Sequence, residues 1–502
     1  MQELQGGRVA RRKSCAVEKQ YEAEVAAALN AAALPGRTRA AAVENLARRQ
    51  ESETKECTLM NQRGPVTAVI VGAGHRALAY AKYSRRRPDQ LKIVGVADPN
   101  EQRRRQAAEL FEIPPDRCFE TAEELAAVPR FADAVINGTM DRQHVPTSLP
   151  LLKAGYHLLL EKPIATSEEE MWQLADAAKA YERTVMICHV LRYAPFYVKI
   201  RELVAAGEIG DILNIQTVEY VSYHHMAVGF IRGKWNSKER CGSSMLMAKC
   251  CHDLDLIAWM KSGIAPVKVS SFGGRMYFRP EKAPAGAGTR CLVDCPIEKD
   301  CLYSARKHYL DHPDRWAFYV WDQLEHIENP TLEQKAKLLE TSPYGRCVWK
   351  SDNDVVDHQS VVIEFEDGST ATHNMVGGAP RGARRISLIG TKGEIEGEFD
   401  TSRIAVRHID PSPGGKDYTE QVIDLNITGD MHGAFGGHGG GDLRLVADFC
   451  RILLGEKPSI SCTSLEDSIN GHLIGYRADR AMENGAVEFL GRERGTAQKA
   501  GA

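Results

Sequence analysis

A lysine at the end of a short apolar strand is the first feature of this 502-residue chain with a chemical use. Lys162 stands in Glu161-Lys162-Pro163, directly after the apolar run Tyr156 to Leu160. A lysine acts as an acid or base on a substrate hydroxyl when burial or nearby positive charge lowers its proton affinity. The tripeptide therefore predicts a catalytic lysine where a substrate and a cofactor meet.

A glycine-rich turn lies about ninety residues earlier and follows an apolar run of its own. It reads Gly72-Ala73-Gly74-His75-Arg76-Ala77. Small residues in such a turn permit a tight bend and close approach of the backbone to a pyrophosphate. Asp98 ends the next apolar run, where its carboxylate can accept hydrogen bonds from an adenosine ribose. Together the turn and the aspartate predict a dinucleotide site.

The choice between NAD and NADP is left open by the residues around this aspartate. Asp98 repels a 2′-phosphate and favours NAD. Arg103 to Arg105 could neutralise such a phosphate, although a solvated helix face is the preferred interpretation of these arginines.

The elements that must position these residues alternate between apolar strands and helices. Strands are predicted at Val66–Val71, Leu91–Ala97, Ala134–Asn137, Tyr156–Leu160 and Val185–Ile187. Continuous apolar strands separated by helices indicate a parallel sheet covered on both faces. Thr166 and Glu169 suggest a capping box before the helix that leads into the last of these strands. The fold class is α/β, with an N-terminal Rossmann doubly wound sheet over residues 61–189.

A second, mainly antiparallel sheet is predicted in an α+β domain over residues 190–495. Asp367-Gly368 joins His358–Phe365 to Ser369–Val376, and Thr391-Lys392-Gly393 joins Ile386–Ile389 to Glu394–Phe399. Both are hairpin patterns. The stretch from about 280 to 352 interrupts this domain as a cysteine-containing insertion. Residues 1–60 are interpreted as an N-terminal extension, disordered or a start-site artefact preceding a true start at Met60.

Several ordered motifs resemble the glucose-fructose oxidoreductase and inositol dehydrogenase family (Gfo/Idh/MocA). After the glycine turn and Asp98 these are Ile136-Asn137-Gly138-Thr139, His144, Ala154-Gly155-Tyr156-His157, Glu161-Lys162-Pro163 and Leu191-Arg192-Tyr193-Ala194-Pro195. The resemblance implies NAD(P)-dependent chemistry on a sugar or polyol and a homo-oligomer. It also implies cofactor contacts from Thr139, His144, Glu161 and Lys162, a substrate contact from Arg192, and a cis bond before Pro163.

The family's second motif, an aspartate followed four residues later by a histidine, is altered here. His252 takes the place of the histidine, but Ala248 stands where the aspartate is expected, and Lys249 lies three residues before His252 on the same helical face. A second cation there would lower the pKa values of Lys162 and His252. The resulting hypothesis is that His252 or Lys162 removes the hydroxyl proton while Lys249 stabilises the alkoxide; a salt bridge from Lys249 to Asp253 or Glu364 is the alternative.

Further histidines are candidates for substrate contacts. His225 lies in Tyr223-His224-His225, and His438 lies in a glycine-rich run before a helix. His438 is the stronger candidate, because a glycine-rich loop suits a bound ligand.

Four cysteines of the insertion could hold a structural zinc ion. Cys291, Cys295, Cys301 and Cys347 supply four soft ligands that could stabilise a segment too small for a good core. Their spacing is looser than paired CxxC motifs. An iron–sulfur cluster and unrelated buried thiols remain alternatives.

Composition excludes several classes of partner. The formal net charge of -3 gives no basic field for nucleic acid or membrane surfaces, and no apolar stretch approaches a membrane span. We expect a cytoplasmic enzyme with a small-molecule substrate. A redox-neutral epimerase or glycoside-cleaving enzyme with bound NAD, and a non-catalytic dinucleotide sensor, are the alternative functions.

Overall fold

The computed structural model describes residues 64–312, 315–425 and 438–491. The predicted extension, including the hypothesis about Met60, lies outside these residues. From Val66 onward the chain forms one compact unit. No helix in the described ranges is both long and apolar enough to cross a membrane.

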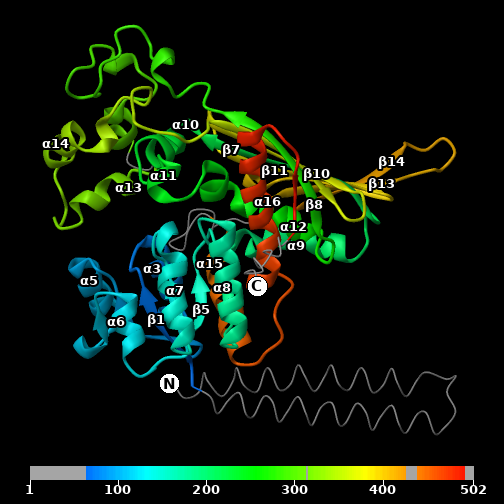
Figure 1. The fold of residues 1–502 in the computed structure, drawn as a ribbon. Coiled ribbons are helices and arrows are strands. Elements are labelled where there is room, and N and C mark those ends of the chain that lie inside the picture. Colours follow the sequence, from blue (N-terminus) through cyan, green and yellow to red (C-terminus); the bar gives the residue numbers. More distant parts are fainter. Residues whose placement is uncertain (1–63, 313–314, 426–437, 492–502) are drawn as a thin grey trace, which may run out of the picture. The chain divides into compact units, whose positions relative to one another are not determined.

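The predicted Rossmann sheet is confirmed, with six parallel strands in the order β3-β2-β1-β4-β5-β6 (Figure 1). Its strands are β1 (Val66–Val71), β2 (Leu91–Ala97), β3 (Cys118–Phe119), β4 (Ala134–Asn137), β5 (His157–Leu160) and β6 (Val185–Ile187). Five of the six were predicted because their apolar runs are buried on both faces. The sixth, β3, is a two-residue edge strand, too short to give a periodic signal.

Helices connect these strands and cover the sheet. They are α3 (His75–Ala81), α4 (Tyr83–Arg86), α5 (Glu101–Phe111), α6 (Ala122–Ala127), α7 (His144–Lys153) and α8 (Glu168–Ala180). The cap of α8 lies one residue later than predicted. Ser167 Oγ accepts from the Glu170 N–H at 3.2 Å, while Glu170 Oε2 accepts from the Thr166 N–H at 3.1 Å. The glutamate therefore contacts the residue before the cap.

A helix from the C-terminal part of the chain contributes to the core of the Rossmann domain. Helix α15 (Gly441–Leu453) returns from the C-terminal part and packs Leu445, Val446 and Phe449 into the core formed by β1, α3 and β2. The apolar face of α15 thus completes the core of the Rossmann domain, although α15 lies outside residues 61–189.

The second sheet has nine strands in the order β14-β13-β12-β11-β7-β10-β9-β8-β15. They are β7 (Ile212–Ser222), β8 (Pro266–Gly274), β9 (His358–Phe365), β10 (Thr370–Ala379), β11 (Ala383–Gly390), β12 (Gly393–Glu398), β13 (Arg403–Ile409), β14 (Tyr418–Asp424) and β15 (Glu488–Phe489). Every pairing is antiparallel except that of β7 with β10, and both predicted hairpins form. The sheet is mainly antiparallel, as predicted.

The helices of this second part pack against the sheet or lie in the connections between its strands. They include α9 (Pro195–Ala205), α10 (Tyr223–His225), α11 (Lys238–Cys241), α12 (Cys251–Met260) and α16 (Leu465–Asn484). A π-helical segment, Leu246–Cys250, leads directly into α12. Figure 1 shows α16 crossing the sheet toward the Rossmann helices.

The insertion lies between β8 and β9 and carries α13 (Phe318–Trp321) and α14 (Leu332–Thr341). The zinc site predicted at its cysteines stays a prediction. Within the described residues, the group of metal-ligand side chains with donor atoms inside 4.8 Å is instead Cys250, Asp253 and His373. The four insertion cysteines, Cys291, Cys295, Cys301 and Cys347, all carry free thiols.

A buried arginine fastens the insertion where zinc was expected. Arg232 is 2% exposed, and its guanidinium donates to Arg346 O at 2.7 Å, Tyr303 O at 2.7 Å and Tyr309 Oη at 3.2 Å. It also lies 3.5 Å from Cys291 Sγ. A small apolar core that includes Ala305, Tyr309, Val320 and Leu339 surrounds these contacts. Hydrogen bonds and apolar burial therefore hold the segment.

Candidate functional site

The glycine turn after β1 has the geometry that a dinucleotide requires. Gly72 has φ of +77°, and a Cβ there would lie 2.8 Å from Thr139 N, so both conformation and space demand glycine. Ala77 packs against Gly138, where an added Cβ would come within 2.7 Å. Beside Gly74 a Cβ would meet no atom within 4 Å. The open space lies where the turn leads into α3, and it fits a pyrophosphate.

Asp98 lies where an adenosine ribose is expected, at the end of β2. It is buried, and its Oδ2 accepts from the Ala73 N–H at 2.7 Å, while Oδ1 accepts from the Asn100 N–H at 2.8 Å. The carboxylate thus joins the glycine turn to the start of α5.

Arg76 and Glu161 contact each other rather than standing apart as two cofactor ligands. Arg76 Nε donates to Glu161 Oε1 at 3.0 Å, and its two terminal nitrogens donate to Asp442 at 3.1 and 2.7 Å. Burial opposes ionisation of Glu161, but Arg76, Lys162 and the Tyr80 hydroxyl outweigh it and lower its pKa. The Arg76 guanidinium therefore joins the glycine turn to Glu161, which follows β5, and to α15.

His144 and Thr139 position the backbone on the other side of Lys162. His144 is buried, with Nδ1 2.6 Å from Pro163 O and Nε2 3.1 Å from Thr139 O. Thr139 Oγ1 donates to Asn137 Oδ1 at 2.8 Å. The predicted cis bond between Lys162 and Pro163 is present. These contacts fix the loop that carries Lys162.

The Lys162 side chain reaches the segment in which the expected aspartate is missing. Its Nζ donates to the backbone carbonyl of Ala248 at 2.9 Å. Ala248 lies in the π-helical segment before α12, and π-helical turns are frequent at functional sites. A carbonyl oxygen thus partners the lysine at the position where the related motif has a carboxylate.

Buried histidines gather beside Lys162. The His252 ring lies 5.7 Å from that of His189 and 6.0 Å from that of His438, and His189 lies 5.3 Å from His472. Burial, followed by Lys162 and its histidine neighbours, holds the pKa of His252 well below its usual value. His252 is therefore neutral at physiological pH and available as a base.

The positive charge of Lys249 is paired with a carboxylate, so Lys249 does not add an unpaired cation to the site. Its Nζ lies 2.8 Å from Glu219 Oε1, a partner on β7 that differs from both predicted alternatives. Arg384 contacts Glu219 at 2.7 Å and Asp253 at 3.1 Å, so two cations meet two carboxylates. Among the largest contributions to the lowered pKa of His252, Lys162 is present and Lys249 is not.

Two predicted substrate contacts have partners within the protein. Arg192 is 1% exposed, and its Nε and Nη2 donate to Asp255 at 2.7 and 2.6 Å. These hydrogen bonds join the segment between β6 and α9 to α12. That geometry fits a structural role better than substrate binding. His225 stacks on Trp316 of the insertion, with ring centroids 4.1 Å apart.

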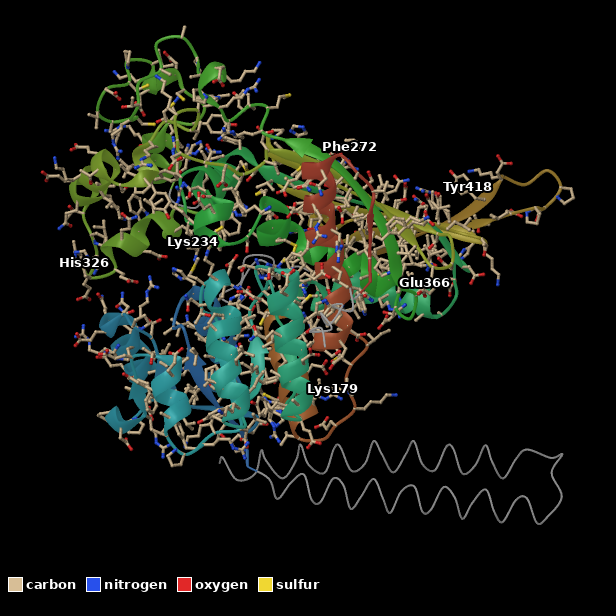
Figure 2. All side chains as sticks on the ribbon, viewed as in Figure 1. Lys179, Lys234, Phe272, His326, Glu366 and Tyr418 are labelled. Atoms are coloured by element: carbon tan, nitrogen blue, oxygen red, sulfur yellow. The ribbon has the colours of Figure 1, made fainter. Side chains whose placement is uncertain are left out.

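Sequence reasoning missed the contribution of distant segments to this region. Asp442 on α15 holds both Arg76 and, at 3.4 Å, His438. The rings of Tyr319, in the insertion, and Trp235 lie 5.9 Å apart, and Lys234, labelled in Figure 2, lies 4.5 Å from the Trp235 ring. No local pattern marks these residues; only the glycine run before α15 hinted at a site.

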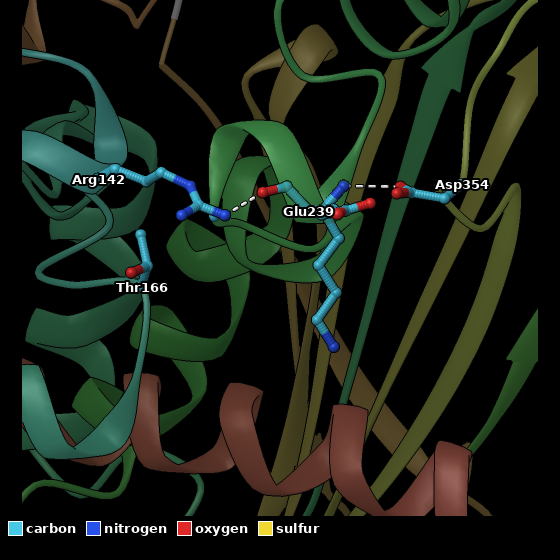
Figure 3. A pocket seen from close by; sticks show the side chains of 6 residues that line it. Arg142, Thr166, Glu239 and Asp354 are labelled. Atoms are coloured by element: carbon cyan, nitrogen blue, oxygen red, sulfur yellow. Dashed lines mark hydrogen bonds between the residues drawn. The ribbon is translucent and has the colours of Figure 1, made fainter.

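A surface pocket lies between the loop before α8 and the loop that contains α11. It is lined by Arg142, Thr166, Lys238, Glu239, Gly242 and Asp354 (Figure 3). Arg142 donates to Glu239 O, and Lys238 N donates to Asp354 Oδ1 at 2.6 Å. Its lining does not include Lys162, His252 or the glycine turn. The candidate site is therefore identified by those residues and not by this pocket.

The fold and the site together define a two-part, dinucleotide-binding oxidoreductase. Residues 66–189 match the oxidoreductase family profile with an NAD-binding Rossmann fold, and residues 197–291 match the GFO/IDH/MocA C-terminal domain. These two matches confirm the resemblance to the GFO/IDH/MocA oxidoreductases over residues 66–189 and 197–291.

The sequence relatives agree with these matches. The chain is 26% identical to the putative oxidoreductase YteT of Bacillus subtilis over 68% of this chain and 79% of that protein. It is 25% identical to an inositol 2-dehydrogenase of Corynebacterium glutamicum over 38% of this chain and about half, 52%, of that protein.

Solved structures share the fold at low identity. An NAD-binding oxidoreductase from Klebsiella pneumoniae has a TM-score of 0.62 at 15% identity, covering 86% of this chain and 100% of that one. A levoglucosan dehydrogenase in complex with NADH has a TM-score of 0.61 at 15% identity, covering 85% and 99%.

Proposed function

We propose that this protein is an NAD(P)-dependent dehydrogenase that oxidises a hydroxyl of a small sugar, inositol or glycoside, or reduces the corresponding ketone. The observation that carries the proposal is that Lys162, which follows β5, donates from Nζ to the carbonyl of Ala248, in the segment that leads directly to the buried His252. The family's dehydrogenases of inositol and xylose support the substrate class.

Different residues serve proton transfer, stabilisation of the developing charge and substrate binding. His252 accepts the hydroxyl proton because it is held neutral, and Lys162 donates to the oxygen as negative charge develops. Lys162 has three N–H donors, and Ala248 O accepts one of them, which leaves two for a substrate. Bound NAD(P) supplies the hydride acceptor at the carbon that bears this oxygen. Lys249, oriented by Glu219, and His438, oriented by Asp442, are proposed to contact the remaining hydroxyls.

The purified protein tests this proposal directly. We expect a bound or added nicotinamide nucleotide to change absorbance when one of a panel of sugars, inositols and glycosides is supplied. Nucleotide binding without any absorbance change across the panel would favour the sensor alternative.

A redox-neutral enzyme that retains its cofactor is the second candidate, and one observation favours it. The insertion contacts both the glycine turn, through His75 and Asp322 at 2.7 Å, and the start of α5, through Arg103 and Glu325 at 3.1 Å. A segment in that position slows release of a bound dinucleotide. Product formed from a sugar or glycoside without accumulation of free NADH would identify this reaction.

A further inference from the structure

The insertion reaches the adenosine end of the proposed nucleotide site through Glu325. Arg103 Nε donates to both Oε1 and Oε2 of Glu325 at 3.1 Å, and Asn100 Nδ2 donates to Oε1 at 3.0 Å. Gln102 donates to the backbone carbonyl of Glu325. These three partners all lie in the turn and first helical positions after Asp98, where a ribose 2′ position is recognised.

A second contact from the same segment lies on the glycine turn. His75 Nε2 is 2.7 Å from Asp322 Oδ1, and the His75 ring lies 5.4 Å from that of Phe318. Residues 318–325 therefore extend from the pyrophosphate turn to the start of α5. Those two places bracket the adenosine half of a bound dinucleotide.

Carboxylates compensate the positive charge of the three successive arginines at this end. Burial opposes ionisation of Arg103, but Glu325, Asp322 and Asp98 outweigh it and raise the pKa of Arg103, so all three carboxylates lie near its guanidinium. Arg104 Nη1 donates to Asp98 O at 2.6 Å. Arg105 is 4.0 Å from Glu109, and its side chain is 65% exposed. The two arginines closest to Asp98 thus already have protein acceptors.

We infer that Glu325 makes this protein select NAD over NADP. Its carboxylate engages Arg103, the group that would otherwise pair with a 2′-phosphate, and it adds negative charge where that phosphate would lie. A 2′-hydroxyl meets neither obstacle. The inference rests on the proposed function, because it requires that the turn bind a dinucleotide.

Calorimetric titration of the full-length protein with NAD and with NADP tests the inference. We expect the unsubstituted protein to bind NAD more tightly. Glu325→Ala should release Arg103 and improve NADP affinity about tenfold relative to NAD. Glu325→Ala combined with Arg103→Ala should lose that gain, because no cation remains for the phosphate.

A matched control is Glu333→Ala, an exposed glutamate at the start of α14 in the same insertion. We expect its NADP-to-NAD ratio to equal that of the unsubstituted protein. A Glu325→Ala protein with an unchanged ratio, at an unchanged melting temperature, would overturn the inference while leaving the proposed function intact. Failure of the unsubstituted protein to bind either nucleotide would overturn both.

Discussion

At the scale of single residues, one backbone carbonyl and one fixed loop position the amine of Lys162. Ala248 O accepts its hydrogen bond at 2.9 Å, and the Pro163 carbonyl is held by His144 at 2.6 Å. Because the amine touches the reacting oxygen in the proposed reaction, its loss should lower the rate more than it lowers binding.

Replacing Lys162 by Met therefore tests the proposed role. We expect kcat to fall by about 10²- to 10⁴-fold, since a positioned acid–base group contributes that much. NAD affinity, measured by titration, should change little. Lys153→Met, at an exposed lysine in the last turn of α7, is the control and should keep full activity. Equal rates in the two variants would contradict the assignment.

At the scale of helices and strands, local sequence patterns predict some of these residues. Contacts between distant elements place the others. The five longer strands, the glycine turn and Asp98 follow local patterns, and Gly72 was predictable because its turn requires a positive φ. The contact between Arg103 and Glu325 joins residues 222 positions apart, and the Arg76–Asp442 pair joins residues 366 apart. Such pairs depend on how the insertion and α15 pack, which no periodicity encodes. Lys249 illustrates the same point, because its partner Glu219 lies on another strand.

His472 of helix α16 holds the loop that follows Lys162. We expect protonation of His472 to make the stability of the protein depend on pH. His472 Nε2 accepts from the Ile164 N–H at 2.9 Å, and burial lowers the pKa of His472 to about 3 from the usual 6.5. The unfolded chain takes up this proton below about pH 6.5, whereas the folded protein does so only near pH 3. Stability should therefore fall as the pH falls through this window.

His472→Gln tests that contribution by urea unfolding at several pH values. Between about pH 6 and 4 the free energy of unfolding should fall less steeply in the variant, by about 1.4 kcal/mol per pH unit. Above pH 7 the two curves should run parallel. Identical slopes throughout would show that His472 is protonated equally in both states.

The insertion should depend on Arg232 rather than on a metal ion. Arg232→Met removes three hydrogen bonds from a buried guanidinium and leaves two backbone carbonyls without their donor, which should cost about 3 kcal/mol. Thermal unfolding would show this as a lowered melting temperature. A metal chelator, and Cys295→Ser, should leave the melting temperature unchanged. A large loss of stability on chelation would support the zinc hypothesis instead.

At the scale of the whole molecule, the outer face of the second sheet carries apolar side chains that no helix of the described residues covers. Strand register places Phe272, Val362 and Phe489 on one face, because Ser270, two residues before Phe272, pairs with Val362, and Phe489 pairs with Lys268. Phe272 is 71% exposed and Phe489 66%. Figure 2 labels Phe272 at the outer edge of the sheet. Exposed apolar side chains that share a face mark protein–protein contact sites.

We therefore propose that this face mediates the homo-oligomer that the family resemblance implies. Sedimentation velocity should show a dimer or larger assembly, and Phe272→Asp should shift it toward monomer, because a charge buried at an interface without a partner is costly. The control is Leu302→Asp, at a leucine 73% exposed in the insertion, which should keep the assembly. Circular dichroism should show both variants folded. If the unsubstituted protein sediments as a monomer at micromolar concentration, or if both variants dissociate equally, the open face is not the interface.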